Sequence, residues 1–276
     1  MKKREHPCFE KTYEAVRIHL PIAPLCNVGC RYCNRKMDCV NESRPGVSSK
    51  VLQPYEACKL VADVSNKGRL DVVGIAGPGD PMANYKELLE TVRLIRNFYQ
   101  KKCIDFPLFC LSTNGLSLER YAEELYENGV SYYTFTINSL NEKVSTGIYD
   151  FVTYDGKKYI GMEASKLLKK KQLEALDYLS QKRVHIKINM VYIEGINDTQ
   201  VLEIAHMAKY YNCDLLNIMP MIHVPDTPLY NAPMTDESHL YELKKRAKNF
   251  VPLMEHCMHC RADAFGTIPC VCENKR

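Results

Sequence analysis

The sequence predicts an α/β fold, a partial (β/α)6 barrel whose mostly parallel sheet is curved and open. Two observations lead to this prediction: short β-rich runs alternate with longer amphipathic stretches, and polar motifs follow the strands. Strict alternation implies parallel strands joined by right-handed crossovers. A chain of 276 residues with 46% hydrophobic residues can bury one substantial core. We therefore expect the barrel at residues 16–250, with an N-terminal extension (1–15) and a cysteine-rich C-terminal extension (251–276) covering its open end.

Each element is predicted from its own residue pattern. Strands are expected at the short β-rich runs, residues 16–23, 71–76, 107–112, 132–138, 184–192 and 215–219. Helices are expected where apolar residues recur near helical spacing, at residues 55–66, 85–99, 118–128, 166–181, 199–211 and 235–250. Segment 138–166 is polar, rich in Gly and Tyr and without a clear period, so we expect an inserted loop over the site. In such sheets the chemistry collects at the carboxyl ends of the strands, where the polar motifs lie.

Composition and charge argue against a nucleic-acid-binding or membrane protein and favour one that binds a metal or cluster. The formal net charge of +4, from 37 basic and 33 acidic residues, is close to balance, so nucleic acid is not expected as a partner. No run of about 18 apolar residues occurs, and the basic N-terminus leads into no hydrophobic segment. We expect a cytoplasmic protein with no membrane partner. Thirteen cysteines in a reducing compartment favour metal or cluster ligation over disulfides.

Cys26, Cys30 and Cys33 form a CxxxCxxC motif after the first predicted strand. A compact loop at this spacing can direct three thiolates at one face of a four-iron cluster and leave one iron without a protein ligand. That open iron can chelate the amino and carboxylate groups of a substrate. A zinc site is the alternative, but zinc normally takes a fourth protein ligand. The spacing therefore favours an iron–sulfur cluster.

Four motifs in chain order resemble the radical S-adenosylmethionine superfamily. They are the cysteine motif with an aromatic residue before its last cysteine, a glycine-rich segment at 77–81, a strand end at 112–115, and a segment at 191–198. The resemblance implies an enzyme that binds S-adenosylmethionine beside a four-iron cluster on a partial barrel. The residues that it implies in cofactor binding are Tyr32, Gly77, Pro78, Gly79, Asp80, Thr113, Asn114, Asn138 and Ile193.

Within that superfamily, the segments 6–8, 33–46, 217–222 and 256–264 resemble the NifB family of nitrogenase cofactor assembly enzymes. The resemblance implies a lyase- or transferase-type carbide synthase with three four-iron clusters. Two of them are substrate clusters, fused into an eight-iron core around a carbide that comes from the S-adenosylmethionine methyl group. The implied ligands of the substrate clusters are Cys8, His19, Cys39, Cys110, Cys257 and Cys260. From the residues alone, a satisfied core histidine remains open for His19, and half of a zinc site for the last two cysteines.

Charged residues lie in the motifs around these implied ligands. An arginine there can donate to cluster sulfides, and a carboxylate can take or orient protons. The residues expected in such catalytic roles are Glu42, Arg44, Arg261 and Asp263. The cysteines expected to be ordinary thiols are Cys58, Cys103 and Cys213. Cys270 and Cys272 have no assigned role.

The implied partners are iron–sulfur cluster donors, a reductant such as ferredoxin or flavodoxin, and a downstream cofactor carrier or scaffold. We expect a monomer. Two other functions remain open: a radical enzyme that uses auxiliary clusters on an organic or peptide substrate, and a non-catalytic iron–sulfur carrier, which would need no adenosine pocket. The sequence departs from the expected NifB pattern at 138–141 and 225–228, which leaves room for a related enzyme with a modified role.

Overall fold

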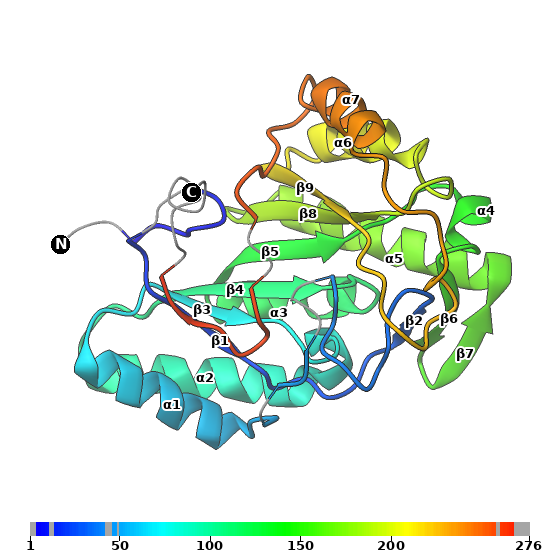
Figure 1. Ribbon diagram of the computed structural model, residues 1–276. Coiled ribbons are helices and arrows are strands. Elements are labelled where there is room, and N and C mark those ends of the chain that lie inside the picture. The colour runs from blue at the N-terminus through cyan, green and yellow to red at the C-terminus, as the bar shows by residue number, and fades with distance from the viewer. Residues whose placement is uncertain (1–3, 11–13, 42–45, 49, 258–259, 268–276) are drawn as a thin grey trace.

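The computed structural model describes residues 4–10, 14–41, 46–48, 50–257 and 260–267 (Figure 1). Its main sheet is seven-stranded, in the order β10-β1-β3-β4-β5-β8-β9, and every neighbouring pair is parallel except β10 with β1. The strands are β1 (Arg17–Leu20), β3 (Val72–Ile75), β4 (Leu108–Thr113), β5 (Val130–Thr136), β8 (His185–Tyr192), β9 (Leu215–Pro220) and β10 (Phe265–Gly266). The predicted α/β fold is confirmed, and all six predicted strands are present.

The helices connect these strands in the predicted order. They are α1 (Pro54–Lys67), η1 (Pro81–Asn84), α2 (Tyr85–Lys101), η2 (Leu118–Arg120), α3 (Ala122–Glu127), α4 (Glu142–Ser145), α5 (Gly161–Ser180), α6 (Gln200–Tyr210) and α7 (Glu237–Ala247). Capping residues in the sequence explain where several of these helices begin. A capping box at Gln53 precedes α1, and the Asp236 carboxylate accepts hydrogen bonds from the first backbone amides of α7. Of the described helices, none is both long and apolar enough to cross a membrane.

The two faces of the main sheet differ in polarity because side chains alternate along each strand. Ile18, Phe109 and Ile188 point toward the helices and belong to the main buried core. Their strand neighbours His19 and Lys187 line an internal cavity on the other face. Parallel sheets covered by helices on both faces are usually apolar throughout. The polar inner face is therefore the wall of a cavity.

Segment 138–166 is not the inserted loop that its composition predicted. It contains α4 and a hairpin of β6 (Tyr149–Tyr154) and β7 (Lys157–Ile160), which forms a small sheet with β2 (Val28–Cys30). The hairpin turns at Asp155 and Gly156, with φ of 51° and 72°. Asp-Gly is a strong signal for such a two-residue turn, because both positions need positive φ. The hairpin consequently holds the strand that carries Cys30.

The C-terminal segment bridges the two edges of the open sheet. Near β9, Leu216 N donates to Pro252 O and Met254 N donates to Leu216 O, at 2.9 Å each. Farther along, β10 pairs with β1 at the opposite edge. Figure 1 shows this segment running across the front of the strands. It therefore covers the inner face of the sheet.

The N-terminal segment packs against the same inner face through a stack of aromatic rings. His6 stacks on Tyr132 at a centroid distance of 4.7 Å, and Tyr132 stacks on His185 at 4.6 Å. His256 and the Pro7 carbonyl oxygen form a 3.0 Å hydrogen bond, so the two terminal segments also touch each other. This contact brings Cys8 and Cys257, far apart in the sequence, to one cavity.

Candidate functional site

Cys26, Cys30 and Cys33 line one cavity, here called the triad cavity. Cys26 precedes β2, Cys30 ends it, and the Cys33 amide donates to the Cys30 carbonyl at 3.1 Å. All three are free thiols, and burial raises the pKa of each, that of Cys26 to about 12. Buried thiols ionise readily only when a cation replaces the lost hydration. Three partly buried thiols that line one cavity therefore fit a metal cluster.

The glycine-rich turn after β3 supports the cysteine loop by direct backbone contact. Gly79 N donates to Ala23 O at 2.5 Å, and Asp80 N donates to Leu25 O at 2.8 Å. A Cβ atom on Gly79 would overlap the Leu25 carbonyl oxygen and lie 2.6 Å from its carbonyl carbon. Only glycine allows the two backbones to approach so closely. The turn thus sets the position of the residues just before Cys26.

Asp80, Thr113 and Asn114 line the triad cavity from the ends of β3 and β4. The buried Asp80 carboxylate accepts hydrogen bonds from Asn114 N at 2.6 Å, Thr113 Oγ1 at 2.9 Å and Met82 N at 2.9 Å. Burial raises the pKa of this carboxyl, and these hydrogen bonds oppose the rise. Asn114 Nδ2 lies 4.0 Å from Cys26 Sγ. Polar groups from two strand ends are therefore held beside the thiols.

Other residues expected in cofactor binding support the wall of this cavity without lining it. Asn138 Nδ2 donates to Tyr32 Oη at 2.7 Å, and Asn138 Oδ1 accepts from Val191 N at 2.8 Å. Ile193 is fully buried in the smaller apolar core. The Pro78 carbonyl, next to Gly77, accepts from Cys39 N at 2.9 Å. Direct contact of Tyr32, Gly77, Pro78, Asn138 and Ile193 with a cofactor remains a prediction.

A second cavity, here called the inner cavity, is built on the polar face of the sheet. In the strand register, His19 lies beside Gly74 and Gly74 beside Cys110. A Cβ on Gly74 would lie 2.7 Å from His19 Cδ2, so the glycine makes room for the imidazole. The predicted ligands that line this cavity are Cys8, His19, Cys110, Cys257 and Cys260. Cys39 lines the triad cavity instead.

The environment of His19 suits a nitrogen ligand. Burial lowers its pKa to about 4, so the imidazole is neutral near pH 7. Its Nδ1 lies 3.1 Å from the Arg261 carbonyl oxygen. Because a carbonyl can only accept, Nδ1 carries the proton and the Nε2 lone pair is left available. The two cavities adjoin, since Asn41 and Ser112 line both.

Two buried cations in the inner cavity were not predicted as site residues. Arg17 and Lys187 are each 7% exposed, and among the described residues that line the cavity there is no Asp or Glu. Arg17 Nη2 donates to Cys260 Sγ at 3.1 Å, and Arg17 Nε has no hydrogen-bond partner among the described residues. Buried charge is costly unless it is matched. The inner cavity therefore suits an anion.

The predicted catalytic residues are only partly described. Glu42 and Arg44 lie outside the described residues, as do Cys270 and Cys272. Arg261 Nε donates to Asp263 Oδ1 at 2.9 Å on the exposed C-terminal segment. Arg35, which was not predicted as a site residue, lines the triad cavity and donates to the Pro24 and Pro78 carbonyls at 3.1 and 3.0 Å. It ties the cysteine loop to the glycine-rich turn.

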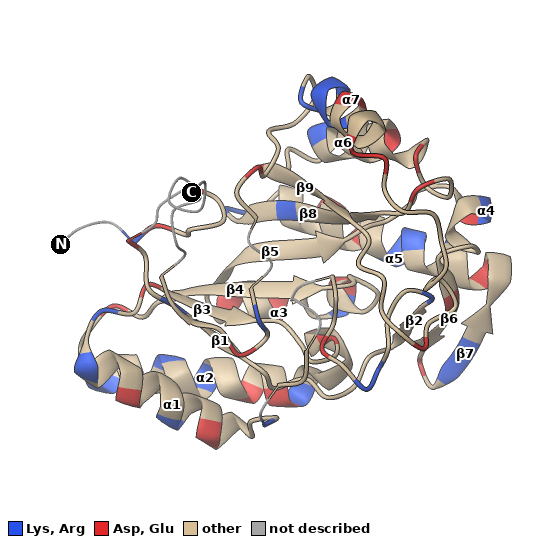
Figure 2. Ribbon diagram, in the orientation of Figure 1, with Lys and Arg blue, Asp and Glu red and all other residues tan. Residues whose placement is uncertain are grey.

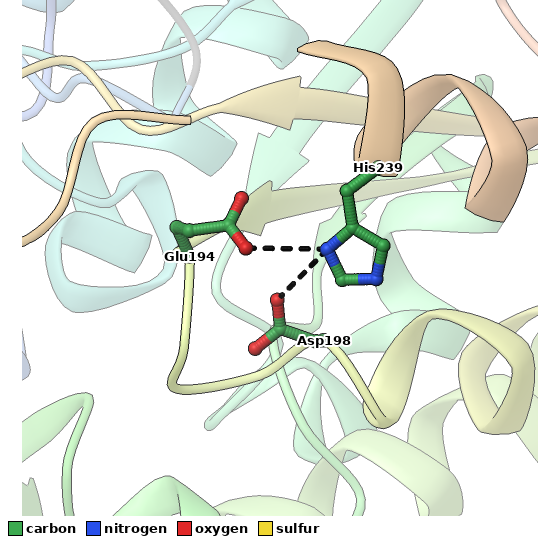
Figure 3. Close-up of side chains that lie close together, drawn as sticks. All are labelled: Glu194, Asp198 and His239. Carbon is green, nitrogen blue, oxygen red and sulfur yellow. Dashed lines mark hydrogen bonds and ion pairs between the residues drawn. The ribbon is translucent and has the colours of Figure 1, made fainter. Parts of the chain in front are cut away.

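A separate polar cluster joins the β8–α6 loop to α7 (Figure 3). His239 Nδ1 lies 3.2 Å from Glu194 Oε1 and 3.8 Å from Asp198 Oδ1. The buried Tyr192 hydroxyl donates to Asp198 Oδ1 at 2.6 Å. The cluster fastens α7 to the barrel. Sequence reasoning could not find it, because Glu194 and His239 are separated by 45 positions.

Comparison with known proteins shows which family model and which relatives match this chain. The sequence model of the radical SAM superfamily, a protein-family model, matches residues 20–208 of this chain. Two similar proteins are described as FeMo cofactor biosynthesis protein NifB. The protein of Chlorobaculum tepidum is 42% identical to this chain, and the match covers 96% of this chain and 62% of the relative. The protein of Klebsiella pneumoniae is also 42% identical, and the match covers 97% of this chain and 58% of the relative. The chain thus spans about 60% of the length of these curated relatives.

Solved structures with the same fold are more distant in sequence. SuiB of Streptococcus suis bound to S-adenosylmethionine has a TM-score of 0.60 and 13% identity, over 87% of this chain and 50% of that one. The structure of anSMEcpe with bound AdoMet has a TM-score of 0.57 and 14% identity. This match covers 85% of this chain and 60% of that one. At these identities the likeness supports the half-barrel fold.

Proposed function

Because the chain belongs to the radical SAM superfamily, we propose that it acts in nitrogenase cofactor biosynthesis as a carbide-forming radical enzyme. Its similarity to the NifB proteins of two bacteria supports this proposal over the length that the chain shares with them. The observation that carries it is the inner cavity. Five potential iron ligands and two buried cations line a cavity that adjoins the cysteine triad.

Cys26, Cys30 and Cys33 would hold the resident four-iron cluster, with S-adenosylmethionine at its open iron. Such a cluster, when reduced, would supply the electron for cleavage of S-adenosylmethionine into methionine and a 5′-deoxyadenosyl radical. Asp80 and Asn114 place polar groups beside the triad, where the cofactor's amino group and ribose need partners. Arg35 and the glycine-rich turn keep the loop in position. These residues bind and orient, and the surrounding wall excludes water.

The substrates would be two further four-iron clusters held in the inner cavity by Cys8, Cys110, Cys257, Cys260 and the His19 imidazole. A neutral imidazole binds iron more weakly than a thiolate, which suits a substrate that must leave. We infer that one S-adenosylmethionine molecule transfers its methyl group to a cluster sulfide and leaves as S-adenosylhomocysteine. The radical from a second molecule then takes a hydrogen atom from that methyl. The two remaining hydrogens would leave as protons and the irons of the two clusters would supply the electrons, so that the carbon ends as the carbide of an eight-iron product.

This function needs other proteins. Iron–sulfur cluster donors would supply the substrates, a ferredoxin or flavodoxin would supply electrons, and a carrier or scaffold would take the product. Cys39 lines the triad cavity and, in this proposal, serves a cluster at the boundary between the two cavities, where Asn41 and Ser112 contact both.

His19→Ala tests the proposal. The variant should keep the response of the triad cluster to S-adenosylmethionine and lose the nitrogen coupling in the pulsed EPR spectrum of a substrate cluster. Folding should survive, because truncating one buried ring costs at most about 3–5 kcal/mol. His206→Ala, on the outer helix α6, is the matched control and should leave the coupling unchanged. The ligand assignment is wrong if His19→Ala still forms the eight-iron product at the wild-type rate.

A further inference from the structure

We propose that a third cavity, between β9 and α7, is the portal through which anionic iron–sulfur substrate reaches the inner cavity. This vestibule, as we call it, has a volume of about 440 Å³, within the usual range for ligand sites. The inference rests on the proposed function, because it assigns a path to the substrate of that function. It adds a binding surface and the charge of the species that crosses it.

The vestibule and the inner cavity share one wall. Asn217, Met219, Met254 and Cys257 line both. Two of these four residues are methionines, whose unbranched side chains adapt readily to a changing contact. Cys257, a proposed substrate ligand, therefore stands between the vestibule and the interior. A cluster held in the vestibule would meet it first.

The charge of the vestibule is positive. Among its described lining residues, Lys244, Lys245 and Lys248 of α7 outnumber the single acidic residue Glu255, which gives a net charge of +2. Figure 2 shows basic residues gathered along α7. Lys248 Nζ is paired with Glu255 at 2.8 Å. The net charge favours an anion and disfavours a cation.

Lys244 is the most informative of the three lysines. It is only partly exposed, and among the described residues no carboxylate lies within ion-pair distance of its Nζ. Burial lowers the pKa of Lys244 because its ammonium group loses hydration, whereas Glu237, Cys257 and Glu255 oppose this shift. An anion in the vestibule would replace the missing hydration. Further in, Arg17 is buried as well, and among the described residues its Nε has no hydrogen-bond partner.

The three lysines lie on α7 or directly after it, and hydrogen bonds hold the first turn of this helix in place. Asp236 accepts hydrogen bonds from Ser238 N at 2.9 Å and His239 N at 3.2 Å, and His239 is held by Glu194. Lys244 and Lys248 are four residues apart and share one face of α7. Positive charge thus extends from this helix through the vestibule to the two buried cations. Such an arrangement raises the encounter rate of an anion by about 10- to 1000-fold at low salt.

The test uses chain that already carries the triad cluster and no other iron. The probe is a synthetic anionic four-iron cluster with 2-mercaptoethanol thiolates, and uptake is followed by absorbance and by iron analysis after desalting. The variant is Lys245→Glu with Lys248→Glu, which changes the vestibule from net +2 to net −2. The matched control is Lys59→Glu with Lys67→Glu on α1, at the opposite end of the molecule (Figure 2). All four lysines are exposed, so each protein should fold.

Wild-type chain and the α1 control should take up the probe at the same rate, and that rate should fall as salt is added. The vestibule variant should be at least about tenfold slower at low salt, should become faster as salt is added because salt screens the repulsion, and should reach the same final iron content. Lys245→Arg with Lys248→Arg should restore the rate. Equal rates for the vestibule variant and the wild type would overturn the portal and leave the proposed function standing. Failure of the wild type to gain any iron would overturn the proposed function itself.

Discussion

Replacing Gly79 with alanine tests how the glycine-rich turn positions the cysteine triad. The new Cβ would lie 2.6 Å from the Leu25 carbonyl carbon and 2.8 Å from the Ala23 carbonyl oxygen. Both atoms are backbone, so no side-chain rotation relieves the overlap and the two segments must separate. Two backbone hydrogen bonds, from Gly79 and Asp80, join these segments and would be lost or lengthened.

The size of the effect follows from those contacts. Two hydrogen bonds contribute about 1–3 kcal/mol in total, and the steric strain of one extra carbon in a packed site costs about 1–3 kcal/mol. Gly79→Ala should therefore lower the free energy of unfolding by about 2–6 kcal/mol, out of a total of roughly 5–15 kcal/mol. Because the displaced segment leads directly into Cys26, the variant should also hold its triad cluster less tightly.

Urea denaturation of the iron-free chain and retention of the triad cluster against a chelator would measure the two effects. Gly68→Ala is the control, because a Cβ there would meet no atom of the part of the chain that the structure describes within 4 Å. Its stability should stay within about 1 kcal/mol of the wild type. If Gly79→Ala matched this control in both measurements, the close approach of the turn to the cysteine loop would not matter, and our account of the triad's support would be wrong.

Three further predictions concern the cysteines and the buried cations. Reconstituted wild type should carry about twelve irons if three four-iron clusters bind, whereas the Cys257→Ser/Cys260→Ser variant should carry fewer by iron analysis yet keep its triad cluster. Arg17→Gln should lower the reduction potential of a substrate cluster in a redox titration, because a buried cation is removed, and Arg17→Lys should restore part of it; an unchanged potential would show that Arg17 does not contact the substrate. In iron-free chain at pH 8, an alkylating reagent should label exposed Cys103 before buried Cys213, whose pKa is raised to about 12 by burial and by Asp214, as mass spectrometry would reveal.

Much of the fold could be predicted because most elements carry their own local signals. The strand predicted at 184–192 is β8, His185–Tyr192, since β-branched and apolar residues alternate there with polar ones. Helix α7 begins at Glu237, inside the predicted range, because Asp236 caps it. The hairpin of β6 and β7 was missed although Asp155-Gly156 marks its turn. Because segment 138–166 is polar, we predicted a loop there despite this turn signal.

The candidate site was predictable where its residues are close in sequence and difficult elsewhere. The cysteine triad and the Asp80 turn lie in short motifs, and the structure brings them to one cavity. Arg17 and Lys187 were missed, although each alternates with apolar neighbours inside a strand, which is the signal for a side chain on the inner face. The vestibule depends on how α7 meets the C-terminal segment, and only the tertiary structure shows that contact.

The most direct test of the central claim follows the methyl carbon of S-adenosylmethionine. The chain, loaded with its triad cluster and with substrate clusters, would be reduced in the presence of S-adenosylmethionine that carries an isotope label in its methyl group. Our account predicts that the label appears in an eight-iron product, together with 5′-deoxyadenosine from the second molecule of S-adenosylmethionine. If 5′-deoxyadenosine formed while the iron–sulfur product remained unlabelled, the chain would be a radical enzyme that acts on some other substrate.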